Sequence, residues 1–257
     1  MFAGGRIATW GRMIVRRLPF LPLGAVSGVL LALPAAGQGL GAQGLSCPVF
    51  PPASVSFDIT LAPLQRNDGL AIAQLTRLPG RTSGPAGSAR GHVLGLTQAR
   101  YGEQSQVSAL FQRLPDGSYC ASANVLTVSF GFQQRVVHVA RELPPGSCIH
   151  GEVLAHEMRH VAVDEALLRE FAPVIRQRLD EAVARLAPVR SRSQQQAMAS
   201  VRRPLEAAMR TAMQEFGRER DRRQAQVDTV EEYARIRQVC NGEVAKYLPQ
   251  PQVRRRA

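Results

Sequence analysis

The chain has little of what several protein classes need. Only one of its 32 cationic residues is a lysine (Lys246), and aromatic residues make up 5% of its 257 residues. So few aromatic side chains argue against a protein that stacks nucleic-acid bases, despite the net charge of +12. The sequence contains no internal repeat. Its hydrophobic content of 45% predicts an ordinary globular fold of one domain or two small ones, not a disordered chain.

Residues 1–37 have the pattern of a signal peptide. The segment Leu18–Leu33 is mostly apolar but is interrupted by prolines and glycines, and the small residues Ala35, Ala36 and Gly37 follow it. The residues before this segment include no acidic residue and four arginines: Arg6, Arg12, Arg16 and Arg17. We therefore expect a periplasmic or secreted protein, with an uncleaved membrane anchor as the alternative. No later stretch approaches transmembrane length, so we expect no stable membrane insertion after signal removal. The remaining positive charge is spread along the chain, so we expect no nucleic-acid partner.

No pair of cysteines has the C-x-x-C spacing, which argues against a cysteine-type zinc site. The chain has four cysteines, and an even number in an oxidising compartment predicts two disulfides. Three pairings are possible. We favour Cys120–Cys148, which flank a predicted strand pair, and Cys47–Cys240, which lie near the two ends of the mature chain.

The sequence predicts an α+β fold, with a mostly antiparallel β-rich region (residues 38–150) before a helical region (residues 151–248). Residues 79–89 are rich in Gly, Ser and Pro and predict a loop, and residues 249–257 predict a flexible basic tail. Alternating or β-favouring residues predict strands at Ser54–Leu61, Gly69–Thr76, Gly91–Ala99 and Gln106–Arg113, and a hairpin of Asn124–Phe132 with Arg135–Glu142.

Apolar residues at helical spacing predict a helix over Gly151–Leu186, which Pro173 should kink or interrupt. A turn over Pro188–Ser193 should lead into a second helix, Gln194–Arg223. A third, shorter helix should begin near Thr229 and end near Asn241. The region therefore predicts a long α-helical hairpin.

The first helix carries the sequence His156-Glu157-Met158-Arg159-His160, an H-E-x-x-H motif. Residues four apart lie on one helical face, so both imidazoles can bind one tetrahedral ion. Glu157 lies beside them, where it can take a proton from a metal-bound water whose pKa the ion lowers to about 7. These residues predict a Zn²⁺ site with Glu157 as general base.

Residues 148–168 around this motif resemble the zincin metalloproteases. More narrowly, they look like the bacterial predicted secreted zinc-dependent proteases, a resemblance that extends faintly over the strands before the motif and the helices after it. The resemblance implies His156 and His160 as zinc ligands and Glu157 as the catalytic base. It implies a peptidase that acts on a peptide or protein substrate through a zinc-bound water.

The third ligand is not fixed by the motif. The extended metzincin form, which needs a Gly and a His shortly after the second His, is missing. The thermolysin-like form uses a Glu about twenty residues on, and Asp180 and Glu181 fall near that distance. On an unbroken helix they would lie about 30 Å from His160, so they could serve only if Pro173 marks a reversal of the chain. Hairpin geometry with a turn near residue 191 brings about residue 226 opposite His156. We therefore rank Asp228 first and Glu232 second. Asp164, one turn beyond His160, is expected either to orient a histidine ring through a hydrogen bond or to be a solvated helix aspartate.

Three further residues have open roles. His138 could face the cleft, although an ordinary strand histidine is the simpler interpretation, and His150 is expected to be structural or solvated. Tyr233 could donate a hydrogen bond to a tetrahedral intermediate or could pack against the helix pair. The alternative to a peptidase is a non-catalytic envelope protein that binds a partner through the helical hairpin, with zinc structural or absent.

Overall fold

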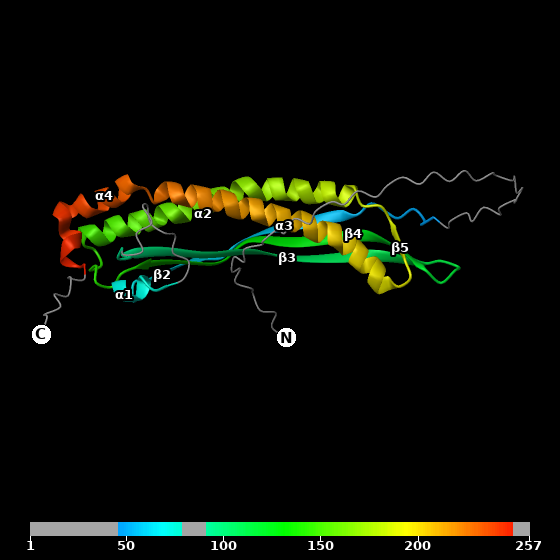
Figure 1. Ribbon diagram of the computed structural model, residues 1–257, viewed down its shortest axis with the longest axis horizontal. Coiled ribbons are helices and arrows are strands. Elements are labelled where there is room, and N and C mark those ends of the chain that lie inside the picture. Colours follow the sequence, from blue (N-terminus) through cyan, green and yellow to red (C-terminus); the bar gives the residue numbers. More distant parts are fainter. Residues whose placement is uncertain (1–45, 79–90, 249–257) are drawn as a thin grey trace, which may run out of the picture. The chain divides into compact units, whose positions relative to one another are not determined.

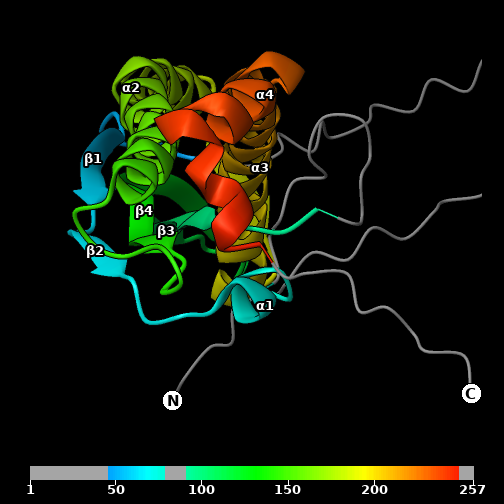
Figure 2. The ribbon, with the colours of Figure 1, turned by 90° about the vertical axis from the view of Figure 1, so that its left-hand side faces the viewer.

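The computed structural model describes residues 46–78 and 91–248. The predicted signal peptide, the predicted loop over residues 79–89 and the predicted basic tail lie outside the described residues. The described residues contain both a sheet and helices, as an α+β fold requires, and the long helices α2 and α3 lie over one face of the sheet (Figures 1 and 2).

The sheet is mixed, so the prediction of a mostly antiparallel β region was wrong. Its strands are β1 (Ser54–Leu61), β2 (Leu64–Asn67), β3 (Gly95–Arg113), β4 (Tyr119–Val139) and β5 (Val189–Ser191). The other four strands all pair with the long strand β4. Strands β1 and β2 run parallel to it, and β3 and β5 run antiparallel. The parallel pairs arise because the chain crosses from β1 and β2 to β3 before it enters β4.

Two of the predicted breaks between strands do not exist. Gly91–Ala99 and Gln106–Arg113 were expected as separate strands, but Gly95–Arg113 is one strand. The expected hairpin of Asn124–Phe132 with Arg135–Glu142 is also wrong, since both segments contribute to β4. The hairpin lies earlier, where β3 turns into β4 and the Leu114 amide bonds the Ser118 carbonyl at 2.8 Å. Pro115-Asp116-Gly117, which favours a turn, occupies that loop.

The strand predicted over Gly69–Thr76 is a loop followed by the short helix α1 (Ile72–Leu75). The long helices agree better with the sequence. They are α2 (Cys148–Ala184), α3 (Gln194–Val227) and α4 (Val230–Gln238), followed by the 3₁₀ helix η1 (Cys240–Lys246). Pro173 lies inside α2 without ending it, and the predicted turn over Pro188–Ser193 contains β5.

The main core lies between the two long helices and the sheet. Alternate residues of β4 point to the helices, and the side chains of Phe130 and Phe132 are fully buried. Phe216 of α3 packs against both rings, with centroid separations of 5.0 Å and 6.1 Å. Because this packing continues along the helix pair, α2 and α3 are fixed side by side on the sheet.

The structure contains two disulfides, but their pairing differs from the preferred one. Cys47 is bonded to Cys120 and Cys148 is bonded to Cys240. The hairpin explains the second bond, because α3 runs back along α2 and brings α4 to the start of α2. That disulfide therefore joins the beginning of the motif helix to the start of η1, just after α4. Among residues 46–78 and 91–248, none of the helices combines the length and the hydropathy of a membrane span.

Candidate metal centre

The H-E-x-x-H motif lies in the third turn of α2, close to the start of this helix. The Ser147 side chain caps the helix by accepting a hydrogen bond from the His150 amide at 3.3 Å. The motif histidines His156 and His160 are each 12% exposed, and Glu157 is 5% exposed. The two histidines therefore stand at the border of the core, with Glu157 directed further inward.

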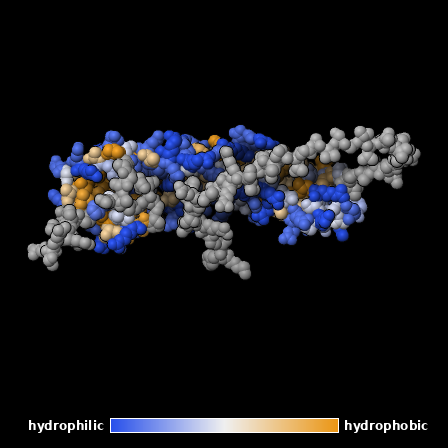
Figure 3. Space-filling view, in the orientation of Figure 1, coloured by the Kyte–Doolittle hydropathy of each residue, from blue (hydrophilic) through white to orange (hydrophobic). Residues whose placement is uncertain are grey.

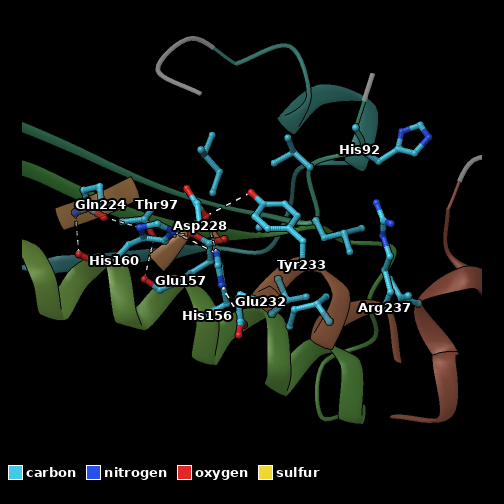
Figure 4. A pocket seen from close by; sticks show the side chains of 18 of the residues that line it. His92, Thr97, His156, Glu157, His160, Gln224, Asp228, Glu232, Tyr233 and Arg237 are labelled. Atoms are coloured by element: carbon cyan, nitrogen blue, oxygen red, sulfur yellow. Dashed lines mark hydrogen bonds and ion pairs between the residues drawn. The ribbon is translucent and has the colours of Figure 1, made fainter. Parts of the chain in front are cut away.

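Asp228 meets the two motif histidines from the end of α3. Its Oδ1 atom lies 3.2 Å from Nε2 of His156 and 3.2 Å from Nε2 of His160. The two Nε2 atoms are themselves 3.2 Å apart. Three ligand-type atoms thus form a nearly equilateral triangle, and Figure 4 shows the three side chains in its left half.

This triangle has the size that a tetrahedral metal site requires. Ligand atoms at about 2.1 Å from a central ion, arranged tetrahedrally, lie about 3.4 Å from one another. Two imidazoles and a carboxylate are also a donor set that suits a divalent transition metal. His156, His160 and Asp228 could therefore hold a metal ion.

The other three candidates for the third ligand lie elsewhere. Asp180 and Glu181 are on the far part of α2, where they bond Arg176 and Arg185. Because α2 is continuous through Pro173, they remain about 30 Å along the helix from His160. Glu232 lies close to the site, but on the other nitrogen of His156, with Oε1 3.4 Å from Nδ1.

Glu232 instead orients His156. Thr229 caps α4 by accepting from the Glu232 amide at 3.1 Å, while the Glu232 carboxylate accepts hydrogen bonds from Arg235 and Arg159. The hydrogen bond from Arg235, aided by Arg159, lowers the pKa of Glu232 to about 2. The Arg159 guanidinium, itself bonded to Glu232, lies 3.1 Å from the same Nδ1 atom. Glu232 and Arg159 therefore both contact the Nδ1 side of the His156 ring, and Nε2 lies on the side of Asp228.

The Nδ1 atom of His160 also has a hydrogen-bond partner, but this partner is an uncharged residue. Its Nδ1 atom donates to Oε1 of Gln224, a buried residue of α3. The Gln224 amide nitrogen donates to the His160 carbonyl at 3.1 Å and to Asp164 at 2.7 Å. Asp164 also accepts two hydrogen bonds from Arg220, at 2.7 Å and 2.9 Å. The expected contact of Asp164 with a histidine ring is therefore replaced by an indirect one through Gln224.

Sequence reasoning missed Gln224, although the signal was present. The hairpin geometry that brings about residue 226 opposite His156 also brings about residue 222 opposite His160. A polar residue near that position, on the face of α3 that turns toward α2, was therefore a candidate partner for the histidine.

Glu157 is held against the first residues of β3. The Thr97 hydroxyl donates to its Oε2 atom at 2.8 Å and contacts its backbone carbonyl at 3.0 Å. Gly95 allows this approach, because a Cβ atom there would lie 2.5 Å from Oε1 of Glu157. The carboxylate is thus fixed beside the triangle of ligand atoms by the strand and by the helix that carries it.

Burial and charge act against each other in this group. Burial raises the pKa of Glu157, and the neighbouring His160 and His156 offset only part of that increase. Burial also acts to raise the pKa of Asp228, but hydrogen bonds from His156 and His160 outweigh it and hold that pKa far below its usual range. The two carboxylates therefore differ strongly in proton affinity although they face the same histidines.

The triangle and Glu157 line a cavity of about 410 Å³ between β3, α2, α3 and α4. The Tyr233 hydroxyl points into it and donates to Asp228 at 3.4 Å (Figure 4). His138 is not part of this wall, because it lies in β4 with its Nε2 atom 3.2 Å from Gln98. His150 is buried at the start of α2 and lies 3.7 Å from Asp68.

The arrangement brings together three residues that could hold a metal ion, a buried carboxylate beside them and a phenol, all in the wall of one cavity. Comparison with known proteins adds nothing to this geometry, since no family model, curated protein or solved structure matches the chain.

Proposed function

We propose that the protein is an exported zinc-dependent metallohydrolase that cleaves peptide bonds. The observation that carries the proposal is the convergence of two imidazole nitrogens and one carboxylate oxygen at 3.2 Å from one another, beside Glu157, in the wall of a cavity. The resemblance of the motif to the zincins supports peptide bonds as the substrate.

The number of ligands favours a catalytic ion over a structural one. Structural zinc sites in proteins are usually closed by four protein ligands, whereas catalytic sites use three and leave one position for solvent or substrate. Among the described residues the cluster contains three ligand residues, and all three line the cavity. A Zn²⁺ ion held there would supply a positive charge that acidifies water and polarises a carbonyl.

Side chains of the protein perform the proton transfer, stabilise the developing charge and orient the histidine rings. Glu157, anchored by Thr97, takes the proton from the attacking water and delivers it to the leaving amine. Tyr233 donates a hydrogen bond to the negative charge that develops on the carbonyl oxygen. Glu232 and Gln224 hold the two histidine rings in the orientation that directs Nε2 toward the cavity.

Export fits the two disulfides of the structure. Disulfides persist in oxidising compartments and are rare in the cytosol. The signal-peptide pattern of residues 1–37 points to the same compartment.

The proposal is tested by comparing the isolated protein with Glu157→Gln. Both should contain zinc, and the wild type should cleave a reduced, unfolded protein substrate. Glu157→Gln should cleave it at least about 100-fold more slowly, because the proton acceptor is removed and the ion is retained. Glu181→Gln, a change of the same type on the same helix, should have the wild-type rate. A wild type without zinc, or a Glu157→Gln variant at full rate, overturns the proposal and favours the non-catalytic envelope protein.

A further inference from the structure

Strand β1 has an outer side that pairs with no described strand. Its other side pairs residue by residue with positions 125–132 of β4. The Ala62 amide donates to the Phe132 carbonyl at 2.8 Å, so the amide and carbonyl groups of Leu61 point away from β4. The same orientation holds for every second residue before it, namely Val55, Phe57 and Ile59. Among residues 46–78 and 91–248, β1 pairs with β4 alone, so this side is open to a further strand.

Apolar side chains continue from the core to this edge. Val55 is buried in the main core, and Phe57 packs against that core. Ile59 and Leu61 follow on the same face of the strand but are 56% and 45% exposed. The charged residue of β1, Asp58, lies on the other face. Two large aliphatic side chains are therefore exposed to water next to unpaired backbone groups.

Other parts of the surface are more polar than this edge. Strand β2, which continues along the same side of β4, exposes Gln65, Arg66 and Asn67. Figure 3 shows mostly hydrophilic surface along the middle of α2 and α3, on the face that it draws. Sheet edges are usually protected from pairing by charged side chains, prolines or bulges. Residues 54–61 contain no proline, a single charged residue and no break in register, so this edge lacks most of that protection.

Two copies of β1 match each other when they pair antiparallel about a twofold axis at Ile59. In this register the two Ile59 residues lie opposite each other, and Phe57 of each copy lies opposite Leu61 of the other. All of these residues direct their backbone groups outward, as hydrogen-bonded pairs require. On the other face Asp58 lies opposite Thr60, so no like charges meet. An axis at Asp58 would place the two carboxylates opposite each other, which is unfavourable.

We propose that two copies of the chain associate through β1 into a dimer with one continuous sheet, in which Ile59 lies at the twofold axis. The match of the strand with itself selects a second copy as the partner. Pairing satisfies the outward backbone groups and covers Ile59 and Leu61. Figure 2 shows β1 at the outer edge of the sheet beside α2, away from α3 and α4. The cavity stays open, because β1 pairs with positions 125–132 of β4, whereas β3 enters the cavity wall opposite positions 137–139.

The first experiment measures association of the purified protein by analytical ultracentrifugation. The wild type should sediment at micromolar concentration with about twice the mass of one chain. Ile59→Arg should raise the dissociation constant at least about 100-fold, because it places two like charges at the twofold axis. Val174→Arg is the matched control, since it changes a 41% exposed aliphatic side chain on α2 and should remain a dimer. Circular dichroism verifies that both variants are folded.

The second experiment tests the register by disulfide cross-linking. All four native cysteines are in disulfides, so an introduced cysteine supplies the only thiol. Ile59→Cys should form a cross-linked dimer under mild oxidation, because opposite residues of a hydrogen-bonded pair lie about 5.5 Å apart, within the range of a disulfide. Leu61→Cys should not, because it lies about 13 Å along the strands from its own copy.

Three outcomes would overturn the inference. A monomeric wild type excludes the dimer, and an Ile59→Arg variant that remains a dimer excludes β1 as its interface. Cross-linking of Leu61→Cys as efficient as that of Ile59→Cys excludes the proposed register. None of these measurements uses cleavage, so a failure of the dimer and a failure of the peptidase proposal are observed separately.

Discussion

The two halves of α2 pack against the same sheet and the same partner helix, yet they bury different chemistry. In the first half, the buried residues include His150, Glu157 and Asp164, seven residues apart on one face. In the second half, every buried residue is apolar: Leu167, Leu168, Ala172, Ile175, Leu179 and Val183. The same division continues on α3, where Gln224 is the buried residue nearest the site and Phe216 begins the apolar run.

This difference shows how the fold produces a site without a separate domain for it. The core face of one helix continues through both halves, and polar residues replace apolar ones where the cavity opens. Burying polar groups is unfavourable unless hydrogen bonds satisfy them. In the half of α2 that carries the motif, those bonds come from α3, β3 and α4, so the candidate metal centre depends on segments that are distant in the sequence.

The largest contrast is expected between Asp164→Ala and Leu179→Ala, which remove one buried side chain from each half. Asp164→Ala leaves Arg220 without its partner and should lower the free energy of unfolding by about 3 kcal/mol. Leu179→Ala should cost a similar amount by creating a cavity. Only Asp164→Ala should also weaken zinc binding, since it frees Gln224. Urea unfolding and zinc titration against a chelator measure both effects, and equal zinc affinities in the two variants would show that the halves are not distinct.

A narrower change removes only the partner of His160. Gln224→Ala should weaken zinc binding about 10- to 100-fold, because the ring loses the acceptor that orients it. The matched control is Gln177→Ala, an exposed glutamine in the distal half of α2 that bonds Glu181. Competition with a chelator measures the affinity, and a Gln224→Ala variant with the control's affinity would remove Gln224 from the account.

The close approach of β3 to α2 can be tested at one glycine. Gly95→Ala should slow hydrolysis roughly tenfold, because its Cβ displaces the Glu157 carboxylate by up to about 1 Å, while zinc is retained. Gly151→Ala on α2 places its Cβ in open space and should raise the free energy of unfolding by up to about 1 kcal/mol. If Gly95→Ala hydrolyses substrate at the wild-type rate, the position of Glu157 is not critical.

The smallest expected effect concerns Glu219, a residue in the part of α3 that leads to Gln224 and Asp228. Hydrogen bonds from Arg222 and Arg223 lower the pKa of Glu219 from 4.5 to about 2. A lowered pKa in the folded state means that the stabilisation is present above pH 4.5 and is lost as the pH falls toward 2. The stability difference between the wild type and Glu219→Gln should therefore shrink over that range.

Glu206→Gln provides the control for this effect. Glu206 lies on α3 far from the site and accepts a single hydrogen bond from Arg202. Thermal unfolding at several pH values measures both variants. A difference for Glu219→Gln that is constant from pH 6 to pH 2 would contradict the assignment.

The local patterns of the sequence predicted the long helices well, because α2 and α3 carry apolar residues at helical spacing and are capped by Ser147 and Ser193. Pro173 was expected to kink or interrupt the first helix, and α2 continues through it without interruption. The lengths of β3 and β4 were missed because polar residues such as Gln133 and Gln134 interrupt the alternation without breaking the strand.

Asp228 was ranked first as a ligand from hairpin geometry alone, and the structure brings it to His156 and His160. The same geometry, applied to Cys148, would have indicated Cys240 as its partner in place of Cys120. What periodicity could not provide were contacts between segments far apart in the sequence, such as Thr97 with Glu157. Those contacts depend on the register of β3 against β4 and on its position beside α2, and neither follows from local sequence.

The most direct test of the metal centre is the zinc content of Asp228→Ala compared with that of Asp180→Ala. Both variants remove an aspartate from the helical hairpin, one at the ligand triangle and one about 30 Å along α2 from His160. Mass spectrometry of the native proteins should find about one zinc ion per chain in the wild type and in Asp180→Ala, and none retained in Asp228→Ala after dialysis against a weak chelator. A wild type without zinc, or an Asp228→Ala variant that keeps it, would contradict the account.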